Sequence, residues 1–286
     1  MIKFLSIRWN VDPVIFHIGS TEIRYYSLIF VAAFILGMYI FANMLKRENK
    51  DPKLLEKAFY TIFFSTLIGA RLGHCLFYEG AYFIAHPIEI FWPIKDGKWI
   101  GYHGLASHGA AIGILIGLYI YSRKNKLSYL WTLDRIVITV ALAGFFIRMG
   151  NLMNSEIYGH ETNLPWGFIF ARAGETATKH PTQLYEALSY LAIFVILYFM
   201  YFKLKSGTPN GVIFGVFLIL LFTTRLLIEF IKEPQVDNEY IWGLNIGQRL
   251  SIPFIIAGFI VLWYVYWKKK KDADKIANTQ KVTGKK

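Results

Sequence analysis

The chain has 286 residues, of which 55% are hydrophobic and 17% aromatic, whereas only 17% are charged. Because soluble domains contain about 25% charged residues, this composition indicates a protein with several membrane-spanning segments. The net charge of +12 would suggest nucleic-acid binding in a soluble chain, but here it is first compared with the topology. With one cysteine, Cys75, the chain can form neither an intrachain disulfide nor a Cys-rich metal site.

Seven apolar segments follow a short N-terminal stretch, and each is long enough to cross a bilayer, which takes about 20 helical residues. We therefore predict an all-α integral membrane protein, a bundle of about seven transmembrane helices forming one domain over residues 1–267. Residues 268–286 are expected to be a basic cytoplasmic tail without fixed structure. The predicted spans are Tyr25–Leu45, Leu55–Tyr78, Leu105–Ser122, Leu130–Met149, Gln183–Phe202, Gly211–Ile231 and Leu250–Trp267.

Lysine and arginine are concentrated in alternate connections between these segments. Because cytoplasmic connections carry the excess of positive charge, the pattern places the N-terminus outside and the C-terminus in the cytoplasm. The net charge is then mainly a matter of topology and does not call for nucleic acid. The basic connections contain Lys46, Arg47, Lys50, Lys53 and Lys57 after the first span, Arg123, Lys124 and Lys126 after the third, Lys203 and Lys205 after the fifth, and Lys268 to Lys271 after the seventh.

Polar and charged side chains also lie within the predicted spans or at their ends, where a charge costs about 2.5–3.5 kcal/mol near a helix centre. In the predicted orientation they all lie toward the outer side of the membrane. Helix packing could bring them together in one polar cavity open to the outer leaflet. These residues are Tyr26, Arg71, Tyr78, His108, Arg148, His180, Gln183, Glu186, Arg225, Glu229, Gln248 and Arg249.

Several arginines at one depth favour an anionic ligand, because the planar guanidinium matches the geometry of a phosphate group. In the outer leaflet the obvious ligand is an anionic phospholipid headgroup. Two alternatives stay open: Arg225 and Glu229, four residues apart, could form a structural ion pair, and Arg148 could simply extend to the headgroups. No P-loop, zinc motif or Gly-x-Ser-x-Gly motif supports the use of ATP, metal hydrolysis or serine-ester chemistry.

The segment Arg148–Gly159, with the sequence Arg-Met-Gly-Asn-Leu-Met-Asn-Ser-Glu-Ile-Tyr-Gly, resembles the signature of the prolipoprotein diacylglyceryl transferase family. That signature is Gly-Arg-x-Gly-Asn-Phe-x-Asn-x-Glu-x-x-Gly. The departures are Ile147 in place of Gly, Leu152 in place of Phe, and Ser155, Ala110 and His103 in place of common glycines. The polar side chains of the motifs are all retained.

The resemblance extends in order over almost the whole chain and stops before the basic tail. A set of motifs this extended is highly specific. The further matching segments are Asp12-Pro-Val-Ile-Phe16, Arg24-Tyr25-Tyr26, Gly69-Ala-Arg71-Leu-Gly73 with Tyr78, Leu105-Ala-Ser-His108-Gly109, His180-Pro-Thr-Gln183-Leu-Tyr185-Glu186, Arg225-Leu-Leu-Ile-Glu229-Phe-Ile-Lys-Glu233-Pro234 and Gly247-Gln248-Arg-Leu-Ser251-Ile-Pro253.

The resemblance implies a transferase of the bacterial cytoplasmic (inner) membrane, with its active site toward the outer leaflet. It would move the diacylglyceryl group of phosphatidylglycerol to the lipobox cysteine thiol of a prolipoprotein signal peptide, the first step of bacterial lipoprotein maturation. A thioether-linked lipid and glycerol 1-phosphate would result, and no metal or diffusible cofactor is implied. Such a reaction needs an ionised thiol, whose pKa is ordinarily about 8.5, and donors that stabilise the phosphate charge as it develops.

The resemblance also suggests a role for particular residues. Arg148 and Arg225 would bind the phosphate, and His108 would accept the thiol proton. The remaining assignments are Glu156 and Glu229, which would orient the arginines and the signature loop, and Tyr26 and Asn151, which would contact the headgroup or the glycerol.

Two other classes of protein compete with this reading. A transporter or lipid flippase would predict internal repeats and paired broken helices at mid-membrane, and the sequence has no repeated motif. A non-catalytic membrane scaffold would not need several charges within its spans.

Overall fold

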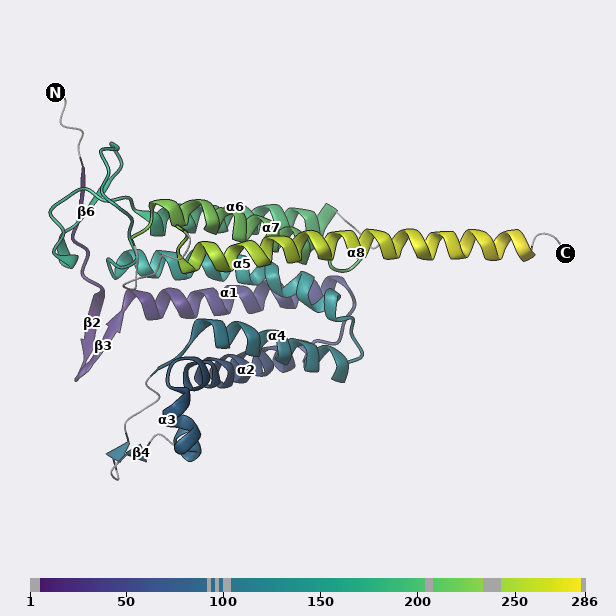
Figure 1. The fold of residues 1–286 in the computed structure, drawn as a ribbon, viewed down its shortest axis with the longest axis horizontal. Helices are drawn as coiled ribbons and strands as arrows, with labels where there is room; N and C mark the ends of the chain where they lie inside the picture. Colours follow the sequence, from purple (N-terminus) through teal and green to yellow (C-terminus); the bar gives the residue numbers. More distant parts are fainter. Residues whose placement is uncertain are drawn as a thin grey trace. The chain divides into compact units, whose positions relative to one another are not determined.

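The computed structural model describes residues 6–91, 94–95, 98–99, 104–203, 208–233 and 243–283. Most of these residues are helical (Figure 1). The helices are α1 (Tyr25–Arg47), α2 (Lys53–Phe77), α3 (Gly80–Ala85), η1 (Pro87–Ile90), α4 (Ser107–Lys124), α5 (Tyr129–Met153), η2 (Ala171–Ala173), α6 (Thr182–Lys203), α7 (Val212–Ile228), η3 (Glu229–Ile231) and α8 (Ile246–Thr283), and the strands are β1 (Ile7–Trp9), β2 (Val14–Ile18), β3 (Thr21–Arg24), β4 (Ile94–Lys95), β5 (Lys98–Trp99) and β6 (Phe168–Phe170).

Each predicted span coincides with a long helix, but within the described residues only five helices are both long and apolar enough to cross a membrane. These are Tyr25–Arg47, Tyr129–Met153, Thr182–Lys203, Val212–Ile231 and Ile246–Ile276. Helices α2 and α4 carry more polar residues along their length, including Arg71 and His74 in α2 and His108 in α4. The structure therefore shows a mostly helical protein with five candidate spans, and the count of seven stays a prediction.

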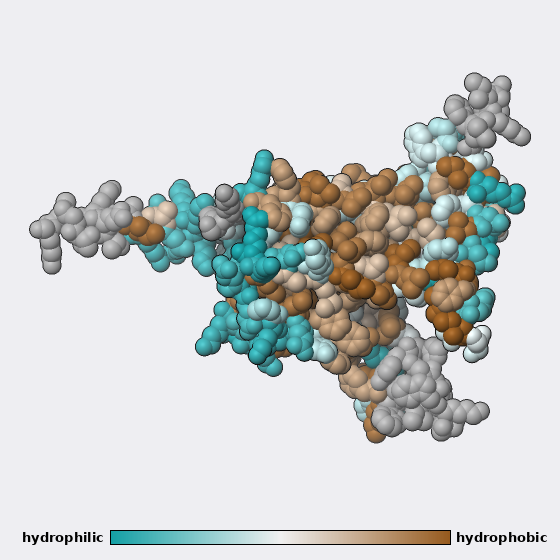
Figure 2. All heavy atoms as spheres, turned by 180° about the vertical axis from the view of Figure 1, so that it is seen from behind, coloured by the Kyte–Doolittle hydropathy of each residue, from teal (hydrophilic) through white to brown (hydrophobic). Residues whose placement is uncertain are grey.

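Large apolar side chains remain exposed along the helices, as expected where lipid replaces water. Leu28, Ile35, Phe199 and Ile260 are 49%, 62%, 57% and 57% exposed. Figure 2 shows hydrophobic residues over the middle of the helices and hydrophilic residues toward their ends. This distribution supports a protein that passes through the membrane several times.

Among the described residues, three small two-stranded sheets depart from the predicted all-α fold. The most distant pairing is parallel and joins β1 to β6, with Ile7 opposite Phe168 and Trp9 opposite Phe170. The indole Nε1 of Trp9 donates a hydrogen bond of 2.9 Å to the carbonyl of Leu152 at the end of α5. This sheet therefore fixes the start of the segment that follows α5. Sequence periodicity could not predict strands of three residues whose partners lie far apart in the chain.

The chain divides into two compact units, Met1–Ile40 with Asp134–Lys286, and Phe41–Leu133, and the single domain over residues 1–267 stays a prediction. Within the smaller unit, α2 and α4 pack backbone against backbone through glycines. A Cβ added to Gly73 would lie 2.6 Å from the Cα of Gly109, and one added to Gly113 would lie 2.9 Å from the Cα of Gly69. Small residues four apart allow this close approach between membrane helices.

In the larger unit, Asp134 of α5 caps the start of α7. Its carboxylate accepts hydrogen bonds from the backbone N–H groups of Gly211, at 2.7 Å, and Phe214, at 2.8 Å. Only 2% of Asp134 is exposed. The contact therefore satisfies N–H groups at a helix N-terminus that have no intrahelical partner.

We expect Asp134→Ala to lower the free energy of unfolding by about 1–3 kcal/mol for each buried donor left unpaired. The measurement is unfolding in detergent. Asp272→Ala, a change of an exposed aspartate on α8, is the control and should leave the unfolding midpoint in place. Equal midpoints for the two variants would contradict the capping role of Asp134.

Helix α8 continues to Thr283, so residues 268–283 are helical, whereas the sequence led us to expect a tail without fixed structure. This stretch contains neither glycine nor proline, and it places Lys268 and Asp272 four residues apart, as it does Lys270 and Asp274. Opposite charges at this spacing favour a helix.

Candidate functional site

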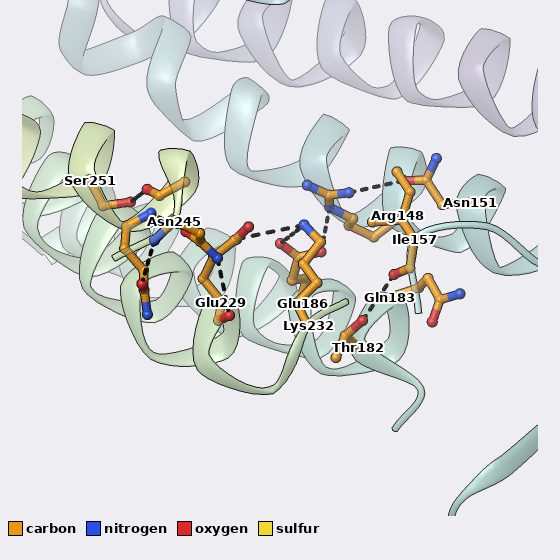
Figure 3. Close-up of polar contacts among 12 residues, drawn as sticks. Arg148, Asn151, Ile157, Thr182, Gln183, Glu186, Glu229, Lys232, Asn245 and Ser251 are labelled. Atoms are coloured by element: carbon orange, nitrogen blue, oxygen red, sulfur yellow. Dashed lines mark hydrogen bonds and ion pairs between the residues drawn. The ribbon is translucent and has the colours of Figure 1, made fainter. Parts of the chain in front are cut away.

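A series of buried polar side chains, Arg148, Glu186, Lys232 and Glu229, connects α5, α6 and η3 in the larger unit (Figure 3). Its first member is Arg148 in the last turns of α5. The Nε of Arg148 lies 2.9 Å from Oε2 of Glu186 on α6, and its Nη1 donates a 3.2 Å hydrogen bond to Oδ1 of Asn151. The Arg148 side chain is 13% exposed and that of Glu186 is fully buried. These two contacts orient the guanidinium and argue against an arginine that simply extends to the headgroups.

The side chain of Lys232 lies between the carboxylates of Glu186 and Glu229 and continues this series. Its Nζ lies 3.7 Å from Oε1 of Glu186 and 3.6 Å from Oε2 of Glu229. Only 3% of Lys232 is exposed. The sequence analysis does not single out this residue, which lies just beyond the predicted span Gly211–Ile231. The signal that could have revealed it was its position three residues after Glu229, directly after an apolar span.

The signature loop begins where α5 ends and is organised by Glu156. One oxygen of this carboxylate, Oε1, accepts hydrogen bonds from the side-chain amides of Asn151, at 2.8 Å, and Asn154, at 3.2 Å. Glu156 thereby holds Asn151, which in turn contacts Arg148. Three of the predicted residues, Arg148, Asn151 and Glu156, are thus joined in one hydrogen-bonded series.

The loop adopts an uncommon backbone that α6 supports. Ser155 and Ile157 have φ angles of +54° and +63°, a region where a β-branched residue such as isoleucine is rarely found. The start of α6 holds the loop through Thr182 Oγ1, which donates to the Ile157 carbonyl at 2.9 Å, and Gln183 Nε2, which donates to the Glu156 carbonyl at 2.7 Å. The positive φ of Ser155 is one that glycine adopts without steric cost.

Tyr26 packs directly on the backbone of α5. A Cβ added to Gly150 would lie 2.6 Å from Cδ2 of the Tyr26 ring. Gly150 lies between Arg148 and Asn151 in the sequence, so the Tyr26 ring lies beside the signature segment. Here glycine is required because the ring leaves no room for a side chain.

Arg225 and Glu229 do not form the ion pair that their spacing allowed. The helix tightens from α7 into the 3-10 turn η3 at Glu229, and the carboxylate of Glu229 contacts Lys232 instead. Arg225 is half-buried and lies within electrostatic reach of Lys232. No carboxylate in the described part of the chain pairs with Arg225, so its charge has no fixed counterion there.

Of the other predicted polar residues, His180, Gln248 and Arg249 lie in the larger unit, whereas Arg71, Tyr78 and His108 lie in the smaller unit. His108 is exposed in the first turn of α4. Arg71 donates hydrogen bonds to the carbonyls of Ile90, at 2.8 Å, and Glu89, at 3.0 Å, which favours a structural role in holding the η1 segment. His103 and Pro234 lie outside the described residues.

The chain just after η3 is fixed to the signature segment from the other side. The N–H of His160 donates to the Ile231 carbonyl at 2.9 Å, and Gly159 forms a β-bridge with Lys232. Outside the spans, Lys179 Nζ lies 2.6 Å from Oε1 of Glu233, and this hydrogen bond holds the pKa of Lys179 above its ordinary value. Lys232 therefore sits on a firmly held segment.

Five candidate spans and a buried series of arginine, lysine and carboxylates define an integral membrane protein with a charged internal site. Comparison with known protein families identifies the family to which this membrane protein belongs. The family model described as prolipoprotein diacylglyceryl transferase matches residues 13–264. The chain belongs to this family of transferases, and the resemblance seen in its motifs is confirmed.

Relatives of this chain carry the name phosphatidylglycerol–prolipoprotein diacylglyceryl transferase. The relative from Bacteroides fragilis is 43% identical over 272 residues, which cover 93% of this chain and 97% of the relative. The relative from Tolumonas auensis is 41% identical and covers 89% and 95%. The relative from Chloroherpeton thalassium is 42% identical and covers 90% and 93%. The similarity thus covers nearly the full length of this chain and of each relative.

Proposed function

We propose that this chain transfers the diacylglyceryl group of phosphatidylglycerol to the cysteine thiol of a prolipoprotein lipobox. The thiolate sulfur attacks the lipid glycerol carbon that carries the phosphate ester, and a C–S bond forms as the C–O bond breaks. The electron pair leaves with the phosphate oxygen. The products are a thioether-linked diacylglyceryl prolipoprotein and glycerol 1-phosphate.

The observation that carries this proposal is the oriented guanidinium of Arg148 within the family signature. Glu186 and Asn151 fix two of its nitrogens, so the group is positioned before the phosphate arrives. Donors that are already aimed at a site of developing charge lower the barrier without further reorganisation.

The other roles follow from the site and the family motifs. Arg225, which has no carboxylate partner in the described structure, binds the phosphate together with Arg148. Glu156 and Glu229 orient the signature loop and the cationic groups, while Tyr26 and Asn151 contact the headgroup or glycerol. His108, exposed at the start of α4, accepts the proton of the thiol.

The test of this function is transfer by the purified full chain. Phosphatidylglycerol and a lipobox peptide are incubated with the protein, and the peptide mass is followed by mass spectrometry. We expect a mass gain equal to one diacylglyceryl group and release of glycerol phosphate. A peptide with serine in place of the lipobox cysteine should gain nothing. An unchanged cysteine peptide with folded protein would refute the proposal.

We place the protein in the bacterial cytoplasmic membrane, where α2 and α4 complete seven spans and the site opens toward the outer leaflet. In a Cys75→Ala background, Lys53→Cys should react with a thiol reagent only from the cytoplasmic side, and Asn163→Cys only from the outside. The opposite pattern would reverse the orientation. Both positions are exposed.

Cys75→Ala should retain most of the transfer activity, because the nucleophile in the proposed reaction is the substrate thiol. Cys75 is 0% exposed within the smaller unit. The measurement is the peptide assay on the folded variant. A loss of several orders of magnitude would indicate a covalent intermediate on the enzyme instead.

Gly150→Ala should lower transfer by up to about 100-fold, because the new methyl group displaces the Tyr26 ring and even a 1 Å misplacement at a reacting site can cost this much. Gly37→Ala is a matched control on the same helix as Tyr26, since its Cβ would meet Thr139 at an ordinary 3.6 Å. Equal activity in the two variants would remove Tyr26 from the site.

A further inference from the structure

Glu186 is shared between two cations, one on each carboxylate oxygen (Figure 3). Oε2 lies 2.9 Å from Nε of Arg148, and Oε1 lies 3.7 Å from Nζ of Lys232. The second carboxylate, Glu229, contacts Lys232 alone among these groups, at 3.6 Å. Within this series two cations therefore face two anions, and Lys232 stands between the anions.

This sharing has an electrostatic consequence for Arg148. Charges at such distances interact strongly in a low-dielectric interior, so a fully buried carboxylate with Arg148 as its single cation would cancel much of the positive charge of the guanidinium. With Lys232 beside its other oxygen, Glu186 still holds Nε of Arg148. The positive charge of Lys232 offsets part of the carboxylate charge, so Glu186 cancels less of the positive charge of the guanidinium. Arg148 is then both held in place and available to an anion.

The backbone around Lys232 has little freedom to release this contact. Lys232 is bridged to Gly159 of the signature segment, and a Cβ on Gly159 would lie 2.7 Å from Cγ2 of Thr182. The N–H of Glu233 donates to the Tyr158 carbonyl at 3.3 Å. The lysine is thus built into the contact between the signature segment and α6.

We propose that Lys232 is a positioning residue of the lipid-phosphate site, which keeps Arg148 attractive to phosphate by sharing the charge of Glu186. This inference rests on the proposed function, because it takes the phosphate of an anionic phospholipid as the ligand of Arg148. Lys232 itself acts through Glu186 and need not touch the lipid.

The first experiment measures binding and transfer separately. Dioleoyl phosphatidylglycerol is added to the full chain in detergent, and binding is followed by native mass spectrometry, with phosphatidylcholine as the reference lipid. We expect Lys232→Met to weaken phosphatidylglycerol binding by about tenfold or more and to raise KM for this lipid more than it lowers kcat, whereas Lys232→Arg retains both. Lys57→Met is the control, because Lys57 lies in the smaller unit, donates a hydrogen bond to Asn125 and contacts none of the groups in this series.

Two double variants distinguish a role of Lys232 at Arg148 from a general need to balance buried charge. They also provide a test if Lys232→Met alone folds poorly. Lys232→Met with Glu186→Gln removes the carboxylate charge next to Arg148, so binding should return to within about threefold of the wild type. Lys232→Met with Glu229→Gln has the same net charge but leaves Glu186 charged, so binding should stay weak. Equal recovery in both doubles, or normal binding in Lys232→Met, would overturn the inference.

These readouts also separate the inference from the proposed function. If the wild type binds phosphatidylglycerol with the expected ranking of variants but never modifies the peptide, the role of Lys232 stands and the transfer proposal fails. If the wild type modifies the peptide and all variants bind the lipid equally, the role of Lys232 fails and the transfer proposal stands.

Discussion

Arg148→Lys is expected to lower diacylglyceryl transfer by about 10²–10³-fold while the protein remains folded. The guanidinium contacts Glu186 through Nε and Asn151 through Nη1, and a lysine has a single nitrogen that cannot make both contacts and still present a donor to phosphate. Removing one positioned donor to a developing charge typically costs about this factor. The lysine keeps a cation opposite Glu186, which preserves the buried ion pair.

The measurement for Arg148→Lys is turnover on the lipobox peptide, with the unfolding midpoint in detergent as the folding check. Arg24→Lys is the control, since Arg24 is 52% exposed and pairs with Glu22 on the β2–β3 hairpin. Near-normal turnover in Arg148→Lys would make this arginine a structural charge and would move the phosphate site elsewhere.

Arg225→Met should lose a similar factor of about 10²–10³ in transfer but should not lose stability. Arg225 has no carboxylate partner in the described structure, and an uncompensated charge in a membrane helix is costly. Replacing it with an apolar side chain removes that cost together with a donor to the phosphate. The result is an inactive protein that unfolds at the same midpoint as the wild type or at a higher one.

Arg148→Met gives the contrast that makes the Arg225 result interpretable. Removing Arg148 leaves a fully buried Glu186 with Lys232 as its remaining cation, and breaking a buried ion pair typically costs 3–5 kcal/mol. Arg148→Met should therefore destabilise the protein, whereas Arg225→Met should not. If Arg225→Met destabilises as much as Arg148→Met, the unpaired state of Arg225 and its role as an anion donor are both contradicted.

The helices were predictable because apolar runs of about 20 residues leave the chain few alternatives in a membrane. The signature residues were predictable too, since Arg148, Asn151 and Glu156 are close in sequence and the end of α5 brings them together. The parallel pairing of β1 with β6 was not, because it joins Ile7 to Phe168 across most of the chain. No local periodicity carries that information.

The ion-pair partners of the buried charged residues were not predictable from the sequence either. Arg148 and Glu186 are 38 residues apart in the sequence and lie on different helices. Only the packing of α5 against α6 brings them together. Lys232 lies one residue beyond the predicted span Gly211–Ile231, and that position does not reveal that its side chain is buried. For Arg225 and Glu229, helical spacing suggested one shared face, but the helix tightens at Glu229 and the carboxylate contacts Lys232.

The most direct test of the account is a structure of the full chain in nanodiscs that contain phosphatidylglycerol. We expect the lipid phosphate within hydrogen-bonding distance of the Arg148 guanidinium, on nitrogens not used by Glu186, while Glu186 keeps its contact with Nε and Lys232 remains beside Glu186. A phosphate bound away from Arg148, with the guanidinium still occupied by Glu186 and Asn151, would contradict the claim that this buried series is the lipid site.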